Sequence, residues 1–164
     1  MADVDGFDAF TSLADSPVYV VTTAARGERA GCLVGFAAQC SLDPVRFAVW
    51  LSKANHTYRL ARTAQSLAVH LVDRRMHHLA EVFGGRCGVQ HDKFTGLGWS
   101  EGPDGVPVLD DALAWFAGRV HDRFDGGDHV AFVLDPVTGG ASPDTEGRPL
   151  SLHDTLDITA GHPA

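Results

Sequence analysis

The chain has 164 residues, 45% of them hydrophobic and 21% charged, which suits one domain with a buried core. Its net charge of −8 argues against a nucleic-acid partner, because phosphate backbones are bound by basic faces. No apolar run approaches the roughly 18 residues that cross a bilayer, and the acidic start MADVDGFDAF does not resemble a signal peptide, so we expect a cytoplasmic protein without membrane contact.

The strands are predicted from runs of β-branched and aromatic residues that end at Gly, Pro or Asp. The second run is unusual, because it is made of small residues that allow another group to approach the backbone closely. The six predicted strands are residues 18–24, 31–41, 46–52, 67–72, 112–124 and 129–137.

Three short helices are predicted between or before these strands, over residues 7–13, 55–64 and 76–83. Asn55 is a plausible N-cap of the second, and the third shows apolar residues at i, i+3, i+4 and i+7. Residues 86–106 read as a long Gly-rich loop. Short connections favour antiparallel pairing, so the predicted fold is mainly β, a six-stranded antiparallel barrel with short flanking helices.

We expect a single domain over residues 1–164. Residues 1–12 form an N-terminal extension in this prediction. Residues 139–164 are punctuated by Gly and Pro, and form a tail that packs on the barrel or on a partner.

Common enzyme motifs are missing: the sequence has no GxxxxGK[ST], no GxSxG and no GxGxxG after a strand. The nine histidines include neighbours at His77 and His78, whose side chains diverge by about 100° on a helix, and no metal site is predicted. Cys32, Cys40 and Cys87 form no CxxC pair, which favours small buried thiols in a reducing compartment.

One polar segment, residues 52–57, joins the end of a predicted strand to the start of a predicted helix. It offers an ammonium group, hydroxyl groups on either side and helix-terminal amides, which together suit a phosphate. The alternative is an ordinary capped helix start. The side chains concerned are Ser52, Lys53, Asn55, His56 and Thr57.

Two further segments suit a flat ligand. A planar ring laid against residues 37–41 would meet backbone amides and carbonyls, although a packed core strand explains the same composition. His129 follows Gly126-Gly127-Asp128 at a strand mouth, where it serves either a tight turn or a contact with a cofactor or nicotinamide.

Taken in order, these segments resemble the flavin reductase-like, FMN-binding split-barrel family. The resemblance spans nearly the whole chain and rests on the combination of pieces. The pieces are residues 17–23, residues 31–44, Ser52-Lys53 with Thr57, Asp92-Lys93-Phe94, Gly127-Asp128-His129 and the C-terminal residues 160–164.

The resemblance implies a homodimer with flavin near the subunit interface, FMN or FAD as flavin, and NADH or NADPH as reductant. It implies hydride transfer to flavin N5 and possible supply of reduced flavin to a monooxygenase, a chemistry that needs little acid–base machinery. The alternatives are a flavin carrier without efficient turnover, or a non-flavin protein, such as a haem-binding one, on the same fold.

Carried over by position, one set of residues lies along the flavin ring, another surrounds the phosphate, and His129 contacts the ring or the nicotinamide. The ring set is Leu33, Val34, Gly35, Phe36, Ala38, Gln39, Cys40 and Ser41; the phosphate set is Ser52, Lys53, Asn55, His56 and Thr57; Phe94 completes the cofactor-binding residues. The family's usual Thr and Ser (G-M-T-x-S) are replaced here by Leu33 and Gly35, so two side-chain donors are lost.

Overall fold

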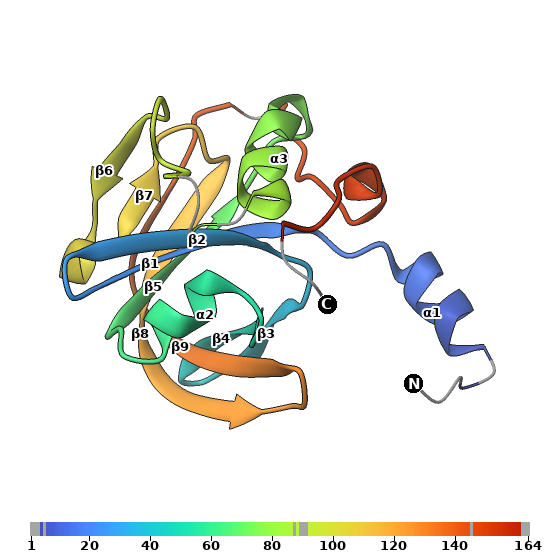
Figure 1. Cartoon of the computed structure of the whole chain (residues 1–164), viewed down its shortest axis with the longest axis horizontal. Coiled ribbons are helices and arrows are strands. Elements are labelled where there is room, and N and C mark those ends of the chain that lie inside the picture. The colour runs from blue at the N-terminus through green and yellow to red at the C-terminus, as the bar shows by residue number, and fades with distance from the viewer. Residues whose placement is uncertain (1–3, 5, 87, 89–91, 145, 162–164) are drawn as a thin grey trace.

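A computed structural model describes residues 4, 6–86, 88, 92–144 and 146–161. Cys87 and the end of the predicted C-terminal match, residues 162–164, lie outside this part of the chain. The described residues form a curled antiparallel sheet with helices at its ends, and Figure 1 shows the arrangement.

The main sheet has seven strands in the order β2-β1-β5-β8-β9-β4-β3, all antiparallel. β1 and β2 are joined by a tight turn in which both Arg26 (φ 52°) and Gly27 (φ 78°) have positive φ, as a two-residue hairpin requires. The strands are β1 Tyr19–Ala25, β2 Glu28–Val34, β3 Ala37–Leu42, β4 Val45–Ser52, β5 Ser66–Leu71, β8 Ala114–Asp125 and β9 His129–Ala141.

The sheet curls into a barrel because strands from both ends of its order bury side chains in one core. Val34 of β2, Val49 of β4, Val69 of β5 and Phe132 of β9 belong to the same buried cluster. β8 and β9 pair along most of their length with two register shifts, which bend the long hairpin around this core.

Short helices and a small second sheet cover the barrel ends. α3 lies over β2, and Leu79 and Phe83 of α3 pack with Val20 and Leu109 in a second core. The covering elements are α2 His56–Ala61, α3 His77–Gly85, β6 Trp99–Glu101 and β7 Pro107–Leu109, with 3-10 turns at η1 Arg74–Met76, η2 Pro103–Gly105 and η3 His153–Thr155. The remaining helix, α1 Phe7–Ala14, does not cover the barrel.

The C-terminal tail, which follows β9, packs back on the barrel, whereas α1 projects away from it. Pro17 bridges Ser151 and Asp73 bridges Pro149, while Leu150 is buried with Val18. By contrast, α1 has no buried residue and projects away from the barrel in Figure 1.

The predicted class, mainly β with an antiparallel split barrel, is confirmed. The strand count differs, because nine strands are present in the described part of the chain. Residues 31–41 form two strands that separate at Gly35 and Phe36, the predicted 86–106 loop contains β6, and β9 continues to Ala141 into the predicted tail.

Candidate functional site

A hollow of about 310 Å³ opens where β2 and β4 end, β9 begins and the tail passes. Its walls are mostly apolar, with a few polar groups along one side, as in small-molecule sites generally. It is lined by Cys32, Leu33, Val34, Gly35, Phe36, Trp50, Leu51, Ser52, Asn55, Asp128, His129, Leu152 and Ala160.

Strand pairing explains why residues so far apart in sequence meet here. Ser52, the last residue of β4, pairs with His129, the first residue of β9. Trp50 lies two residues before Ser52, on the same face of β4, because side chains alternate along a strand.

Gly35 directly follows β2 in the wall of the hollow, and Leu152 of the tail packs against it. A Cβ atom at Gly35 would come 3.1 Å from Leu152 Cδ2. The tail therefore occupies part of the space in which the family's usual Ser side chain would begin.

His129 contacts two other residues that line the hollow, Asp128 and Phe36. Its Nδ1 lies 2.8 Å from Asp128 Oδ1, and its ring lies 5.1 Å from the Phe36 ring, tilted by 55°. The hydrogen bond from His129 holds the pKa of the Asp128 carboxyl below its ordinary value. With Nδ1 as the donor to Asp128, the neutral ring keeps Nε2 as an acceptor.

Two side chains at the polar edge retain hydrogen-bond donors for a ligand. Ser52 Oγ accepts a hydrogen bond from the Ala54 amide at 3.3 Å, and Asn55 Oδ1 accepts one from the Thr57 amide at 2.9 Å. Both contacts use oxygen lone pairs, so the Ser52 hydroxyl proton and the Asn55 amide protons remain available for donation. The predicted N-cap at Asn55 is confirmed.

The remaining members of the predicted phosphate set do not line the hollow. Lys53 Nζ is 2.9 and 2.8 Å from the two carboxylate oxygens of Asp125, an ion pair that holds the pKa of Asp125 below its ordinary value. Thr57 is buried beside Cys32, whose thiol pKa is raised to about 11 by burial. His56 lies 4.0 Å from Glu28, and its buried Nδ1 has no hydrogen-bond partner among the described residues.

The predicted ring residues of β3 are also placed outside the hollow. β3 is an edge strand, and Ala38, Gln39 and Cys40 are exposed on it. The prediction of a buried thiol is therefore wrong for Cys40 and right for Cys32. Ser41 is half-buried on the same strand and does not line the hollow.

Phe94 lies in the second core. Its ring centroid is 5.6 Å from that of Phe83 and 5.9 Å from that of Trp99. The neighbouring Lys93 donates to the carbonyls of Gly31 and Phe83, so the Asp92-Lys93-Phe94 segment ties β2 to α3. In this structure the segment contributes to packing behind the hollow.

The hollow brings together Leu33, Val34, Gly35, Phe36, Ser52, Asn55 and His129 from the predicted set. Sequence reasoning missed the other six lining residues, which are Cys32, Trp50, Leu51, Asp128, Leu152 and Ala160. The alternation along β4 could have indicated Trp50, whereas the aperiodic tail carried no signal for Leu152.

A curled antiparallel sheet with a ligand-sized hollow at its open end defines the class of split-barrel proteins. The family model described as "Flavin reductase like domain" matches residues 11–156. FMN reductase (NADH) RutF 2 of Rhizobium rhizogenes is 36% identical over 124 residues, covering 73% of this chain and 69% of that protein. The chain belongs to the flavin reductase-like domain family, as predicted.

Two other relatives extend this comparison. The stachydrine N-demethylase reductase subunit Stc3 of Rhizobium meliloti is 29% identical over 117 residues. This match covers 69% of the present chain and 50% of Stc3. The crystal structure of nitrilotriacetate monooxygenase component B from Mycobacterium thermoresistibile has a TM-score of 0.75 at 26% identity, covering 90% of this chain and 84% of that one. In the described part of the chain, no helix is long and apolar enough to cross a membrane.

Proposed function

We propose that this chain is an NAD(P)H-dependent flavin reductase, with FMN as its flavin and NADH as its reductant. The observation that carries the proposal is the hollow itself. It combines apolar walls with a polar edge at Ser52 and Asn55, in a chain of the flavin reductase-like family. Such walls fit a flat aromatic ring, and such an edge fits its polar substituents or phosphate.

A bound flavin would supply the redox chemistry, as the acceptor of hydride from a nicotinamide. The chain's own residues bind and orient the two rings. Val34, Phe36 and Leu152 form apolar surface that excludes water from the hollow. His129, fixed by Asp128, stands at the mouth of the hollow, where a nicotinamide would enter.

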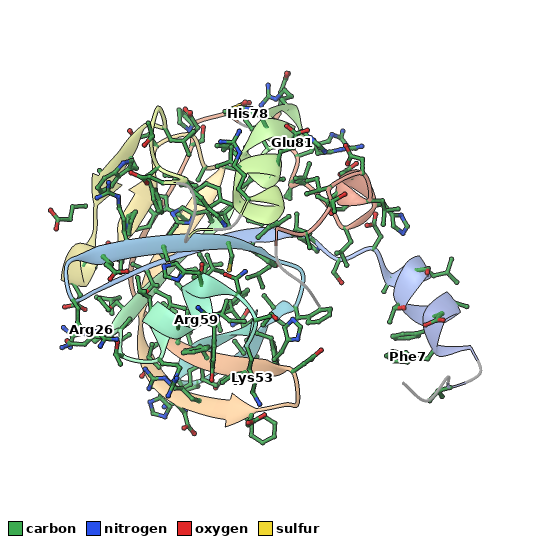
Figure 2. All side chains as sticks on the ribbon, in the orientation of Figure 1. Phe7, Arg26, Lys53, Arg59, His78 and Glu81 are labelled. Carbon is green, nitrogen blue, oxygen red and sulfur yellow. The ribbon has the colours of Figure 1, made fainter. Side chains whose placement is uncertain are left out.

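Lys53 is the nearest candidate partner for a flavin phosphate. Its ion pair with Asp125 is exposed, and exposed pairs exchange partners at little cost. Lys53 follows β4, and Figure 2 shows its side chain beside the turn that joins β8 to β9. Lys53 therefore leaves Asp125 when a phosphate binds at the Ser52–Asn55 edge.

Oxidation of NADH by the purified protein in the presence of FMN tests the proposed reaction. We expect nicotinamide oxidation that depends on both protein and flavin, and parallel assays with FAD and NADPH define the preferred pair. Absence of oxidation with every flavin and nicotinamide contradicts the proposal.

One observation favours a second function, flavin binding without efficient turnover. Leu33 and Gly35 provide no hydroxyl groups, and each hydrogen bond lost to a flavin costs on the order of 1 kcal/mol. Leu152 also narrows the space beside Gly35. A protein that stays yellow on addition of NADH and NADPH is the result expected for this second function.

We also infer a homodimer and a monooxygenase partner. Large apolar side chains are exposed on α1 and on the barrel, including Phe10 (70%), Leu42 (80%) and Phe124 (67%). Two relatives are named as a reductase subunit and as a monooxygenase component. Reduced flavin released from this chain then serves an oxygenase, which a coupled assay with the candidate oxygenase measures.

A further inference from the structure

A histidine and two carboxylates converge between α3 and the tail, apart from the hollow. His77 is the first residue of α3, and Glu81 lies one turn later on the same face, with 3.6 Å between His77 Nδ1 and Glu81 Oε1. Asp157 follows η3 in the tail, and its Oδ1 lies 3.1 Å from His77 Nε2. One ligand atom from each of the three residues lies within 4.8 Å of the others.

The imidazole of His77 is surrounded by oxygen acceptors. Nδ1 faces Glu81, while Nε2 faces both Asp157 Oδ1 and, at 3.1 Å, the backbone carbonyl of Asp154. A neutral imidazole has only one N–H, so one of its nitrogens points a lone pair at oxygen. A proton or a metal cation at that nitrogen would use the lone pair.

The charges around His77 favour a metal cation. Glu81 and Asp157 place two negative charges beside one imidazole, and neither has an ion pair with Lys or Arg in the described part of the chain. Asp154 is engaged elsewhere, because its carboxylate bonds Arg74 at 2.9 Å and the Ser151 amide at 3.0 Å. The cluster therefore has the ligands of a cation site without a competing basic side chain.

We propose that His77, Glu81 and Asp157 bind a divalent first-row transition-metal ion, with Zn²⁺ as the reference ion. One imidazole nitrogen and two carboxylate oxygens are ligands that such ions prefer over Mg²⁺ or Ca²⁺. Three protein ligands leave at least one coordination position for water. The side chains remain partly exposed, so an ion can enter from solvent and small rotations can bring the ligands together.

The ion would link α3 to the tail. Figure 2 shows Glu81 on the side of α3 that faces the C-terminal segment. Leu152 and Ala160, on either side of Asp157 in sequence, line the hollow. Metal binding therefore stabilises one wall of the hollow, although the site itself does not depend on the proposed reductase function.

Calorimetric titration with Zn²⁺ tests this site, using protein freed of metal with a chelator and carrying no histidine tag. Co²⁺ absorption in the visible range reports the ligand field independently. The variants are His77→Ala and the near-isosteric Glu81→Gln and Asp157→Asn. His78→Ala is the matched control, since His78 is the exposed neighbour that diverges from His77 on α3.

We expect one equivalent of Zn²⁺ to bind the wild type and His78→Ala, with a rise in melting temperature. Binding should weaken about tenfold or more in His77→Ala and in each carboxylate variant. Circular dichroism shows whether each variant is folded. If His77→Ala does not fold, the Zn²⁺ affinities of Glu81→Gln and Asp157→Asn decide whether the site binds metal. Absence of binding by the wild type, or equal binding by the ligand variants, overturns the proposal.

Discussion

The contact between Gly35 and Leu152 is a single-residue feature that shapes the hollow. Gly35 leaves room at the end of β2, and Leu152 from the tail fills it. A side chain at position 35 and a large side chain at position 152 therefore compete for the same space. Because protein interiors are close-packed, the two positions should be energetically coupled.

A double-mutant cycle measures this coupling. We expect Gly35→Ser alone to destabilise the protein by about 1–2 kcal/mol, because Leu152 must shift. In the Leu152→Ala background the same change should cost less, since the neighbouring side chain is gone. Urea denaturation of the four proteins gives the coupling energy, and additive effects would show that Leu152 does not limit position 35.

His70 shows how a buried titratable group links stability to pH. Its Nδ1 lies 2.9 Å from the Val20 carbonyl, and its Nε2 accepts the Leu109 amide at 3.1 Å. Burial lowers the pKa of His70 from 6.5 to about 4. The ring is therefore neutral in the folded state at pH 7 and serves as both donor and acceptor between β1, β5 and β7.

We expect the free energy of unfolding to fall as the pH falls from 6.5 towards 4. In this range the unfolded chain binds a proton at His70 and the folded chain does not, so stability is present above pH 6.5 and lost below it. The loss from this residue is at most about 3 kcal/mol. Urea denaturation across this pH range measures it, with His70→Gln expected to show a flatter profile and exposed His78→Gln to match the wild type.

At the scale of elements, Asn55 at the start of α2 is an N-cap and also belongs to the proposed binding site. We expect Asn55→Ala to cost about 1 kcal/mol of stability through loss of the N-cap, and to weaken FMN binding. Asn55→Asp keeps the cap but places a negative charge beside the phosphate. It should therefore keep its stability and lose FMN affinity about tenfold; unchanged affinity would remove Asn55 from the proposed site.

The ion pair between Lys53, which follows β4, and Asp125, the last residue of β8, allows a test of the proposed role of Lys53. Lys53→Ala should weaken FMN binding with little change in stability, because its ion pair with Asp125 is exposed. Asp125→Asn should tighten FMN binding, because it removes the carboxylate that competes with phosphate for Lys53. FMN fluorescence titrations at low and high salt measure both effects. Thr57→Ala is a poor probe of the phosphate, since Thr57 is buried and its loss alters packing.

The sequence predicted those elements whose side chains carry a clear pattern. β1, β4, β5, β8 and β9 follow β-branched or alternating runs, and α3 follows an apolar period. The small residues of 31–41 look continuous, whereas the chain bends at Gly35 and sends β3 to the edge of the sheet. β6 lies within the Gly-rich loop and β7 directly follows it, and both strands are too short to be recognised from sequence.

The candidate site was predictable where strand ends carry polar residues, as at Ser52 and His129. It was not predictable where the tail contributes, because Leu152 reaches the hollow only through tertiary packing. Because residues 31–41 were predicted as one continuous strand, the predicted ring set included residues of β3 that do not line the hollow.

At the scale of the whole molecule, α1 is the feature that the barrel alone does not explain. Phe7, Phe10 and Leu13 are 58%, 70% and 85% exposed, and Figure 2 shows Phe7 clear of the barrel. An isolated helix of this length is marginal in water, so its apolar face needs a partner surface.

We expect sedimentation analysis to show a dimer for the full chain. Phe10→Ser combined with Leu13→Ser should weaken dimerisation while leaving the circular dichroism of the barrel intact, because α1 buries no side chain within its own chain. A chain that sediments as a monomer at all concentrations would contradict the inferred homodimer.

The lining of the hollow comes from Cys32, Ser52, His129, Leu152 and Ala160, which span most of the chain in sequence. Contacts this distant form slowly, because a long loop must close before each is made. The hairpin of β1 and β2 can form early, but the hollow is complete only when Leu152 and Ala160 have docked. During synthesis, the emerging chain therefore has its barrel strands before it has the full lining of the hollow.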